Sequence, residues 1–299
     1  MKEEKIAIIT DSSSGLPAEL LAKNDIQVIN IPIRVGEKVY REGAGLDPLW
    51  FQAEMAETDQ VPVLEQLPVS VLQEQMNNLK EAGYTDALYI LLSGGISPLA
   101  SKVEACANLM DGLKVTVFDS LTAGASLAQM VQLAVAMRRD GCDVSEILTA
   151  LREYQGSSAT LLVLRNLRQL NKHGYVSNGS TLVSNILLRL KTLALFDETG
   201  RLVMVDTQSR LKTLYKEVTK RAHKDYLNLH DRMVITIMET PDRMSTDSLD
   251  EIREQLTSTF PKAKVVVKPF PPSLITITGA HSAGITWGPD WEFLALKKN

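Results

Sequence analysis

The feature that most constrains the fold is a regular alternation of short apolar segments and helical patterns in the first half of the chain. Four apolar runs are expected to be strands, and they cover Ile6 to Thr10, Val28 to Val35, Leu88 to Leu92 and Val115 to Phe118. After Pro98, the residues Leu99, Val103 and Cys106 follow helical spacing, and further helices are expected over 123–139 and 145–154. Because this alternation is typical of parallel sheets with helices on both faces, the sequence predicts an α/β fold with an N-terminal parallel, doubly wound domain.

The second half of the chain has a different pattern, in which strands outnumber the helices between them. The predicted strands cover Ala159 to Leu164, Thr192 to Phe196, Leu202 to Val205, Met233 to Met238, Lys264 to Val267 and Leu274 to Ile277. Helices are expected near 211–226 and 248–259, and the Asp-Glu-Thr-Gly segment at 197–200 is a hairpin signal. We therefore expect a C-terminal α+β domain with a mainly antiparallel sheet. The polar break at 155–158 places the boundary between domains covering 1–155 and 156–299.

Composition and charge exclude several classes of protein. The 299 residues include 32 Lys and Arg against 36 Asp and Glu, a formal charge of −4, so no basic field favours a nucleic acid partner. The two cysteines, Cys106 and Cys142, lack the spacing of a zinc site and are expected to be buried thiols. No run of 18 apolar residues predicts a membrane span, and the first residues are too short and acidic for a signal peptide. We expect a cytoplasmic protein without a metal or cofactor.

Polar turns follow the predicted strands of the first domain. The turn at 10–17 reads Thr-Asp-Ser-Ser-Ser-Gly-Leu-Pro and is most simply a capped entry into a helix. The loop at 93–98 reads Ser-Gly-Gly-Ile-Ser-Pro, with Ser97 as the expected helix cap, and its glycines and hydroxyls could admit a small anion; a plain loop is an equal alternative. The turn at 119–122 should line the same crevice, because carboxyl ends of parallel strands share one edge. No dinucleotide or P-loop glycine pattern is present.

A histidine stands in the glycine-rich loop at 279–284, which reads Gly-Ala-His-Ser-Ala-Gly. Small neighbours leave the imidazole of His281 room to reach a ligand, although a lone loop histidine is more often structural. Ser93 and His281 could form a nucleophile and base, but the chain has no Gly-x-Ser-x-Gly elbow and no third group, which leaves hydrolysis as the weaker alternative.

These residues together resemble the bacterial DegV family over the whole chain. The similarity rests on ordered short motifs: Thr10-Asp11-Ser12, the Gly-x-x-x-Tyr-x-x-Gly stretch at 36–43, Asp119-Ser120, the Leu-x-x-Leu-x-Lys element with Leu167, Leu170, Lys172 and Gly174, and the loop holding His281. The resemblance implies a protein that holds a long-chain fatty acid between two domains and serves a fatty acid kinase. It implies a binding role with no chemistry of its own. The implied ligand contacts are Ser93, Leu64, Ser97, Gly94, His281 and Gly279.

The chain departs from the family pattern at the first head-group loop. The usual Pro-x-Thr-Ser-Gln-Pro is replaced at 62–67 by Pro-Val-Leu-Glu-Gln-Leu, so Leu64 and Glu65 stand where hydroxyls are usual. Losing a donor to a charged ligand weakens binding by roughly 1 to 3 kcal/mol. Either Glu65 turns away from the ligand, or the ligand is a neutral or differently charged lipid.

Overall fold

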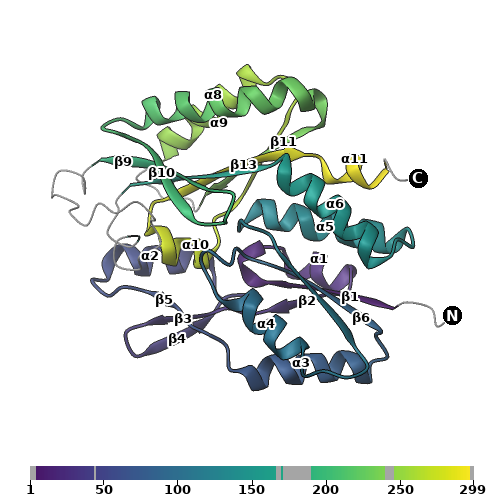
Figure 1. Cartoon of the computed structure of the whole chain (residues 1–299). Helices are drawn as coiled ribbons and strands as arrows, with labels where there is room; N and C mark the ends of the chain where they lie inside the picture. The colour runs from purple at the N-terminus through teal and green to yellow at the C-terminus, as the bar shows by residue number, and fades with distance from the viewer. Residues whose placement is uncertain (1–4, 44, 166–169, 171–189, 240–245, 297–299) are drawn as a thin grey trace.

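The structure is a computed structural model that describes residues 5–43, 45–165, 170, 190–239 and 246–296. Two sheets lie one above the other with helices between them (Figure 1). The first sheet is entirely parallel, and its order is β2 (Ile26–Ile29), β1 (Ile6–Asp11), β6 (Asp86–Leu91) and β7 (Lys114–Asp119). Strands β1 and β6 are buried along their whole length, as expected for strands covered on both faces.

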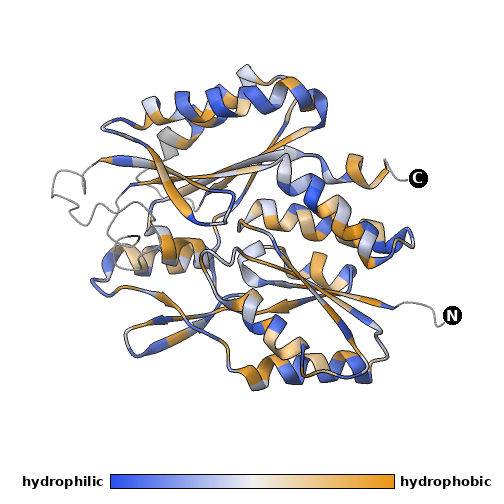
Figure 2. Ribbon diagram, in the orientation of Figure 1, coloured by the Kyte–Doolittle hydropathy of each residue, from blue (hydrophilic) through white to orange (hydrophobic). Residues whose placement is uncertain are grey.

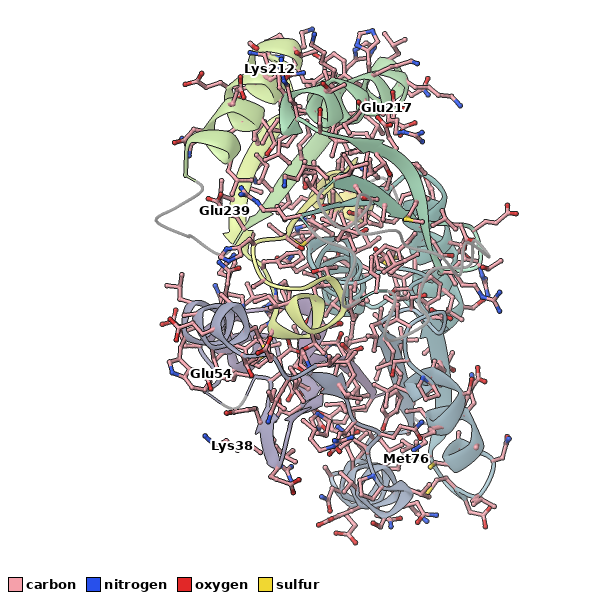
Figure 3. The ribbon with its side chains drawn as sticks, turned by 90° about the vertical axis from the view of Figure 1, so that its left-hand side faces the viewer. Lys38, Glu54, Met76, Lys212, Glu217 and Glu239 are labelled. Carbon is pink, nitrogen blue, oxygen red and sulfur yellow. The ribbon has the colours of Figure 1, made fainter. Side chains whose placement is uncertain are left out.

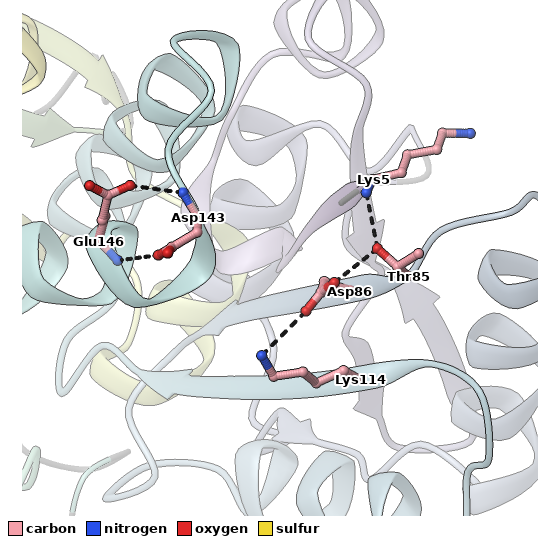
Figure 4. A network of polar contacts seen from close by, with 6 residues as sticks. All are labelled: Lys5, Thr85, Asp86, Lys114, Asp143 and Glu146. Atoms are coloured by element: carbon pink, nitrogen blue, oxygen red, sulfur yellow. Dashed lines mark hydrogen bonds and ion pairs between the residues drawn. The ribbon is translucent and has the colours of Figure 1, made fainter. Parts of the chain in front are cut away.

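Helices cover both faces of this sheet, which confirms the predicted doubly wound α/β arrangement. In Figure 1, α3 (Val69–Glu81) and α4 (Leu99–Ala107) lie on the outer face, whereas α1 (Ala18–Lys23) and α5 (Ala125–Arg139) lie between the two sheets. Helix α6 (Val144–Gly156) packs against α5. It begins with a reciprocal capping box, in which the side chains of Asp143 and Glu146 each accept from the other's backbone N–H (Figure 4).

The segment expected as one strand from Val28 to Val35 is two strands in different sheets. Strand β2 ends at Ile29, and β3 (Pro32–Val35) joins a small antiparallel sheet in the order β4 (Lys38–Arg41), β3 and β5 (Val63–Leu64). Pro32 has no N–H, so it suits the first position of a new strand better than the middle of a continuous ladder. Helix α2 (Pro48–Glu57) follows this sheet.

The second sheet is mainly antiparallel, as predicted. Its order is β10 (Leu202–Gln208), β9 (Lys191–Phe196), β8 (Ala159–Leu164), β13 (Ala283–Pro289), β11 (Met233–Glu239) and β12 (Lys264–Pro269), and β11 with β12 forms its parallel pair. Helices α8 (Leu211–Leu229) and α9 (Thr246–Thr259) cover its outer face (Figure 1). Lys212 and Glu217 of α8 lie at the outside of the molecule in Figure 3, as expected for an amphipathic helix.

The predicted strand from Leu274 to Ile277 is wrong, because these residues lie in helix α10 (Pro272–Thr278). The β-branched run resembled a strand, but Pro272 stands at the first helical position and all seven residues are buried. The hydroxyls of Thr276 and Thr278 donate to the carbonyls of Pro272 and Leu274, four residues earlier. Tertiary burial, rather than local β-propensity, therefore determines that this segment is a helix.

Strand β13 was missed because Gly284, Gly288 and Pro289 make its sequence look like a loop. It is nevertheless a central strand, paired with β8 on one side and β11 on the other. A Cβ at Gly288 would lie 2.9 Å from Cβ of Ser158, so the glycine permits a close approach to the end of α6. The last helix, α11 (Trp291–Leu296), packs against α5.

The amino ends of β1, β6 and β7 are tied together by polar contacts (Figure 4). The backbone N–H of Lys5 donates to Oγ1 of Thr85, which donates to the carboxylate of Asp86 at 2.9 Å. Asp86 also pairs with Nζ of Lys114 at 3.6 Å. These contacts stabilise the edge of the sheet at the amino ends of its strands.

The main apolar core crosses from one sheet to the other. Figure 2 shows apolar residues concentrated along the strands and on the inner helices. Leu162, Met238 and Leu274 from the second half pack in the same cluster as the first parallel sheet. Within the described parts of the chain, no helix is both long and apolar enough to cross a membrane.

Candidate ligand-binding site

Three loops meet at the carboxyl ends of β1, β6 and β7, where the topology of the parallel sheet predicts a ligand crevice. The sheet order changes direction between β1 and β6, because β2 lies on one side of β1 and β7 beyond β6 on the other. At this point Oδ2 of Asp11 accepts a hydrogen bond of 2.7 Å from the backbone N–H of Leu92. The contact joins the first loop to the second.

The first loop is a capped turn, but the cap belongs to a short 3-10 helix and not to α1, which begins at Ala18 without a side-chain cap. Asp11 caps the short helix at Ser12–Ser14 and accepts hydrogen bonds from the N–H and hydroxyl of Ser13. Burial raises the pKa of the Asp11 carboxyl to about 6, although the hydrogen bonds from Ser13 and Leu92 lower it. A buried carboxyl that titrates this near neutrality is typical of binding and catalytic sites, as well as of structural networks.

A second buried carboxylate, Glu42, was not anticipated from the sequence. Its Oε2 accepts 2.8 Å from the hydroxyl of Ser12, and its Oε1 accepts 2.8 Å from the backbone N–H of Ser273 at the start of α10. Burial is the largest cause that raises the pKa of Glu42 to about 7, and the nearby Asp11 carboxylate raises it further. Glu42 therefore links the parallel sheet to the C-terminal half of the chain.

The second loop holds Ser93 and Gly94, two of the expected contacts. The hydroxyl of Ser93 donates 2.6 Å to the carbonyl oxygen of Gly200, at the tip of the β9–β10 hairpin. The N–H of Gly94 donates to both carboxylate oxygens of Asp119 at 3.1 Å, and the N–H of Ser93 donates 2.8 Å to the carbonyl of Thr122. The second and third loops are thus adjacent, as the topology predicted.

Glycines allow this close approach between the loop and the hairpin. A Cβ at Gly95 would lie 2.3 Å from the carbonyl oxygen of Gly200, and a Cβ at Gly200 would lie 2.0 Å from Oγ of Ser93. Gly200 has a φ of +72°, in the left-handed region that favours glycine. The hairpin tip therefore covers the Ser93 loop in this structure.

Ser97 lies just before α4, at the end of the second loop, and Leu64 lies in β5. Oγ of Ser97 accepts 3.3 Å from the N–H of Leu99. Ser97 was expected to cap α4, but this is wrong, because Pro98 stands at the cap position and no side chain caps the helix. Leu64 is half-buried in β5, opposite Ile33. Glu65 and Ser97 both line a small cavity of about 10 Å³. The side chain of Glu65 pairs with Nε of Arg34 at 2.6 Å, so its carboxylate is directed to a cation on β3.

Gly279 and His281 follow α10 in a backbone conformation that few residues adopt. Gly279 has a φ of +87° and the half-buried His281 a φ of +63°. Helix α10 packs against β5, which brings the element before His281 next to the element that carries Leu64. Because a hydroxyl has one hydrogen and Ser93 donates it to Gly200, Ser93 does not donate to an imidazole in this conformation.

Part of the family motif lies outside the described residues. Leu167, Lys172 and Gly174 belong to that part, whereas Leu170 is described and fully buried. Cys106 is buried as expected, but Cys142 is only partly buried. No group of three or more potential metal ligands occurs among the described residues.

Two larger cavities were not anticipated from the sequence. One, of about 360 Å³, lies between the third loop and the β9–β10 hairpin and is lined by Ser120, Thr122 and Phe196 among others. The other, of about 640 Å³, lies between α1 and the segment from Lys268 to Pro272. Cavities of several hundred Å³ are the usual size of small-molecule sites.

A parallel α/β sheet joined to a mainly antiparallel sheet, with polar loops at the carboxyl ends of the parallel strands, places the chain in the class of two-sheet α/β proteins. The family described as "uncharacterised protein, DegV family" matches residues 5–290. The chain belongs to the DegV family. A DegV domain-containing protein of Streptococcus pneumoniae is 32% identical over 217 residues, which is 73% of this chain and 75% of that protein. Another, from Listeria innocua, is 26% identical over 292 residues, 95% of this chain and 98% of that protein.

Solved structures of the family share the fold over almost the whole chain. A fatty acid binding DegV family protein from Streptococcus agalactiae has a TM-score of 0.86 and 23% identity, covering 96% of this chain and 99% of that one. DegV from Bacillus subtilis, described as a fatty acid binding protein, has a TM-score of 0.83 and 22% identity, covering 96% and 99%. A stearic acid-binding protein from Eubacterium ventriosum has a TM-score of 0.78 and 17% identity, covering 97% and 99%.

Proposed function

We propose that this chain binds one long-chain fatty acid between its two halves, 1–155 and 156–299, and carries it without performing chemistry on it. The observation that carries the proposal is membership of a family several of whose solved members are described as fatty acid binding, combined with a shared fold over 96% of the chain. The polar loops at the carboxyl edge of the parallel sheet are the place where the carboxylate would be held.

Ser97 is the hydroxyl of the second loop best suited to donate to a carboxylate. It accepts from Leu99, and its own hydrogen is not given to any residue in the described part of the chain. The Ser93 hydroxyl, in contrast, would have to leave the Gly200 carbonyl before it could donate to a ligand. His281, Gly279 and Gly94 complete the proposed head-group region, and Leu64 provides an apolar contact where the family has a hydroxyl.

The arrangement of Glu65 supports an ordinary anionic fatty acid. Its pairing with Arg34 removes the repulsion that a carboxylate on the first head-group loop would otherwise impose. A neutral or differently charged lipid is the second candidate, because Leu64 offers no donor to balance a buried carboxylate. Comparing oleate with an uncharged lipid of the same chain length separates the two.

An enzymatic role as an esterase is the weaker alternative. It would need the Ser93 hydroxyl to be activated by His281, whereas the observed acceptor is a backbone carbonyl. A carrier shows no turnover of generic esters. Ester hydrolysis that Ser93→Ala abolishes would establish the enzyme instead.

We further infer that the bound acyl group is presented to a fatty acid kinase, as the family resemblance implies. Calorimetric titration of delipidated protein with oleate tests the first part, and formation of an acyl phosphate by a fatty acid kinase only when this chain is present tests the second. If the wild-type protein binds oleate only weakly and Ser97→Ala does not weaken this binding further, the proposed head-group region is contradicted.

A further inference from the structure

A second place for a ligand lies beside β2, the edge strand of the parallel sheet, which β1 separates from β6 and its Ser93 loop. Helix α1 has six residues and none of them is fully buried, although it runs between the two sheets. A cavity of about 640 Å³ opens on one side of it and another of about 100 Å³ on the other, and both are lined by Leu16 and Pro17. Because a helix this short depends on tertiary contacts, the space beside α1 is suited to an occupant.

The walls of the larger cavity are mostly apolar. Leu21 comes from α1, Ile26 and Val28 from β2, and Leu46 from the segment before α2, while Pro271 closes the side towards the second sheet. Its volume lies within the usual range for small-molecule sites. An alkyl chain lying against these side chains would remove apolar surface from water.

Two polar side chains in the wall of this cavity are available to a ligand. The side chains of Ser14 and Asn30 line it, and neither is hydrogen-bonded to another residue in the described ranges. A Cβ at Gly43 would lie 2.6 Å from Oδ1 of Asn30, so the glycine leaves room for the amide. The amide can both donate and accept, and the Ser14 hydroxyl can do the same.

The Glu42 carboxyl near Asn30 disfavours an anion. Glu42 lines the cavity and is 2% exposed, and its two carboxylate oxygens already accept from Ser12 and Ser273. The fully buried Asp11 lies in the same network, close enough for its charge to act on Glu42. A carboxylate or phosphate placed beside Glu42 would be repelled once that group is ionised, whereas a hydroxyl or amide head group could bond to Asn30 and Ser14 at any pH. The one cation among the described lining residues, Lys268, is exposed on β12.

We propose that the cavity between α1, β2 and the Lys268–Pro272 segment binds an uncharged amphiphile, with its alkyl chain against Leu21 and Val28 and its hydroxyl or amide head group on Asn30 and Ser14. This site is separate from the proposed fatty acid site, because its wall contains none of the residues Ser93, Ser97 or His281. The two sites can therefore be occupied together.

The probe for this site is 1-monolauroylglycerol, with laurate as the anionic ligand of equal acyl length. Calorimetric titration into full-length protein already loaded with oleate should show one further molecule of the monoacylglycerol bound, and laurate should bind there at least tenfold more weakly. Val28→Trp fills the cavity and should abolish this binding. Asn30→Leu keeps the size of the side chain and should weaken it roughly fivefold to tenfold, as expected for one lost hydrogen bond.

Val39→Trp serves as the matched control for Val28→Trp, because Val39 is 52% exposed on β4 and lines neither site. Monoacylglycerol binding that Val28→Trp and Asn30→Leu leave unchanged would overturn the second site, and so would displacement of the probe by oleate or equal binding of laurate. If the wild-type protein binds the monoacylglycerol but not oleate, the proposed fatty acid function is overturned and this second site still stands. Retained oleate binding in both cavity variants shows that they fold.

Discussion

The hydroxyl of Ser93 donates 2.6 Å to the carbonyl oxygen of Gly200, which ties the second loop of the parallel sheet to the tip of a hairpin in the other sheet. The contact lies over the region where the family resemblance places the carboxylate. A ligand that uses the Ser93 hydroxyl has to take the place of Gly200.

Gly200→Ala should loosen this closure. The added Cβ would lie 2.0 Å from Oγ of Ser93 at a φ of +72°, so the hairpin has to move away from the loop. We expect bound fatty acid to dissociate roughly tenfold faster, corresponding to about 1.4 kcal/mol, as measured by transfer to an acceptor vesicle. Gly141→Ala is the control, since Gly141 has a φ of +80° but nothing within 4 Å of its Cβ position. Equal release rates from both variants would mean that the hairpin does not control exchange.

Leu64→Thr should strengthen fatty acid binding. It restores a hydroxyl donor at the half-buried position of β5 where the family has one, and a hydrogen bond of this kind contributes about 1 kcal/mol, or roughly fivefold in Kd. The neighbouring Val63→Thr adds the same hydroxyl on the opposite face of the strand and should leave Kd unchanged. A gain in both variants, or in neither, would place the carboxylate elsewhere.

Glu65→Gln should change little. In its ion pair the Glu65 side chain is 33% exposed and the Arg34 side chain 46% exposed. Exposed pairs contribute less than about 1 kcal/mol to the free energy of unfolding. Because the carboxylate is directed to Arg34, oleate affinity should stay within about twofold of the wild type. A gain of tenfold or more by titration calorimetry would show that Glu65 faces the head group after all.

Glu42 should make stability depend on pH. Its pKa in the folded protein is about 7, above its ordinary value of 4.5, so the folded state holds this proton more tightly than the unfolded state. Its contribution is therefore complete below about pH 4.5 and is lost as the pH rises through about 7, by up to about 3 kcal/mol in the free energy of unfolding.

Glu42→Gln imitates the protonated carboxyl and should remove most of this loss when urea unfolding is compared at about pH 5 and about pH 8. The exposed Glu54 on α2 provides the control, since Glu54→Gln should leave the wild-type pH dependence intact. A wild-type slope in the Glu42→Gln variant would assign the pH dependence to other groups.

The adjacency of the second and third loops could be predicted from the sequence, because the carboxyl ends of neighbouring parallel strands share an edge. Asp119 indeed accepts from Gly94. The contact between Ser93 and Gly200 could not, since it joins residues 107 positions apart in different sheets. Sequence patterns describe faces of single elements and do not state how two sheets are stacked.

Two further features depend on burial that local patterns do not reveal. The run from Leu274 to Ile277 has the composition of a strand but is enclosed on all sides as a helix. Glu42 lies between Arg41 and Gly43 in the sequence, which suggests a surface residue, yet in the fold it is buried against the start of α10. The direction of Glu65 towards Arg34 likewise depends on the pairing of β3 with β5.

The most direct test of the central claim is mass spectrometry of the intact protein, purified without detergent. Solvent extraction then allows the bound lipid to be identified. The account predicts a long-chain fatty acid at about one molecule per chain, which Gly200→Ala should lower. Protein that carries no fatty acid, and that binds none when oleate is added, would contradict the account.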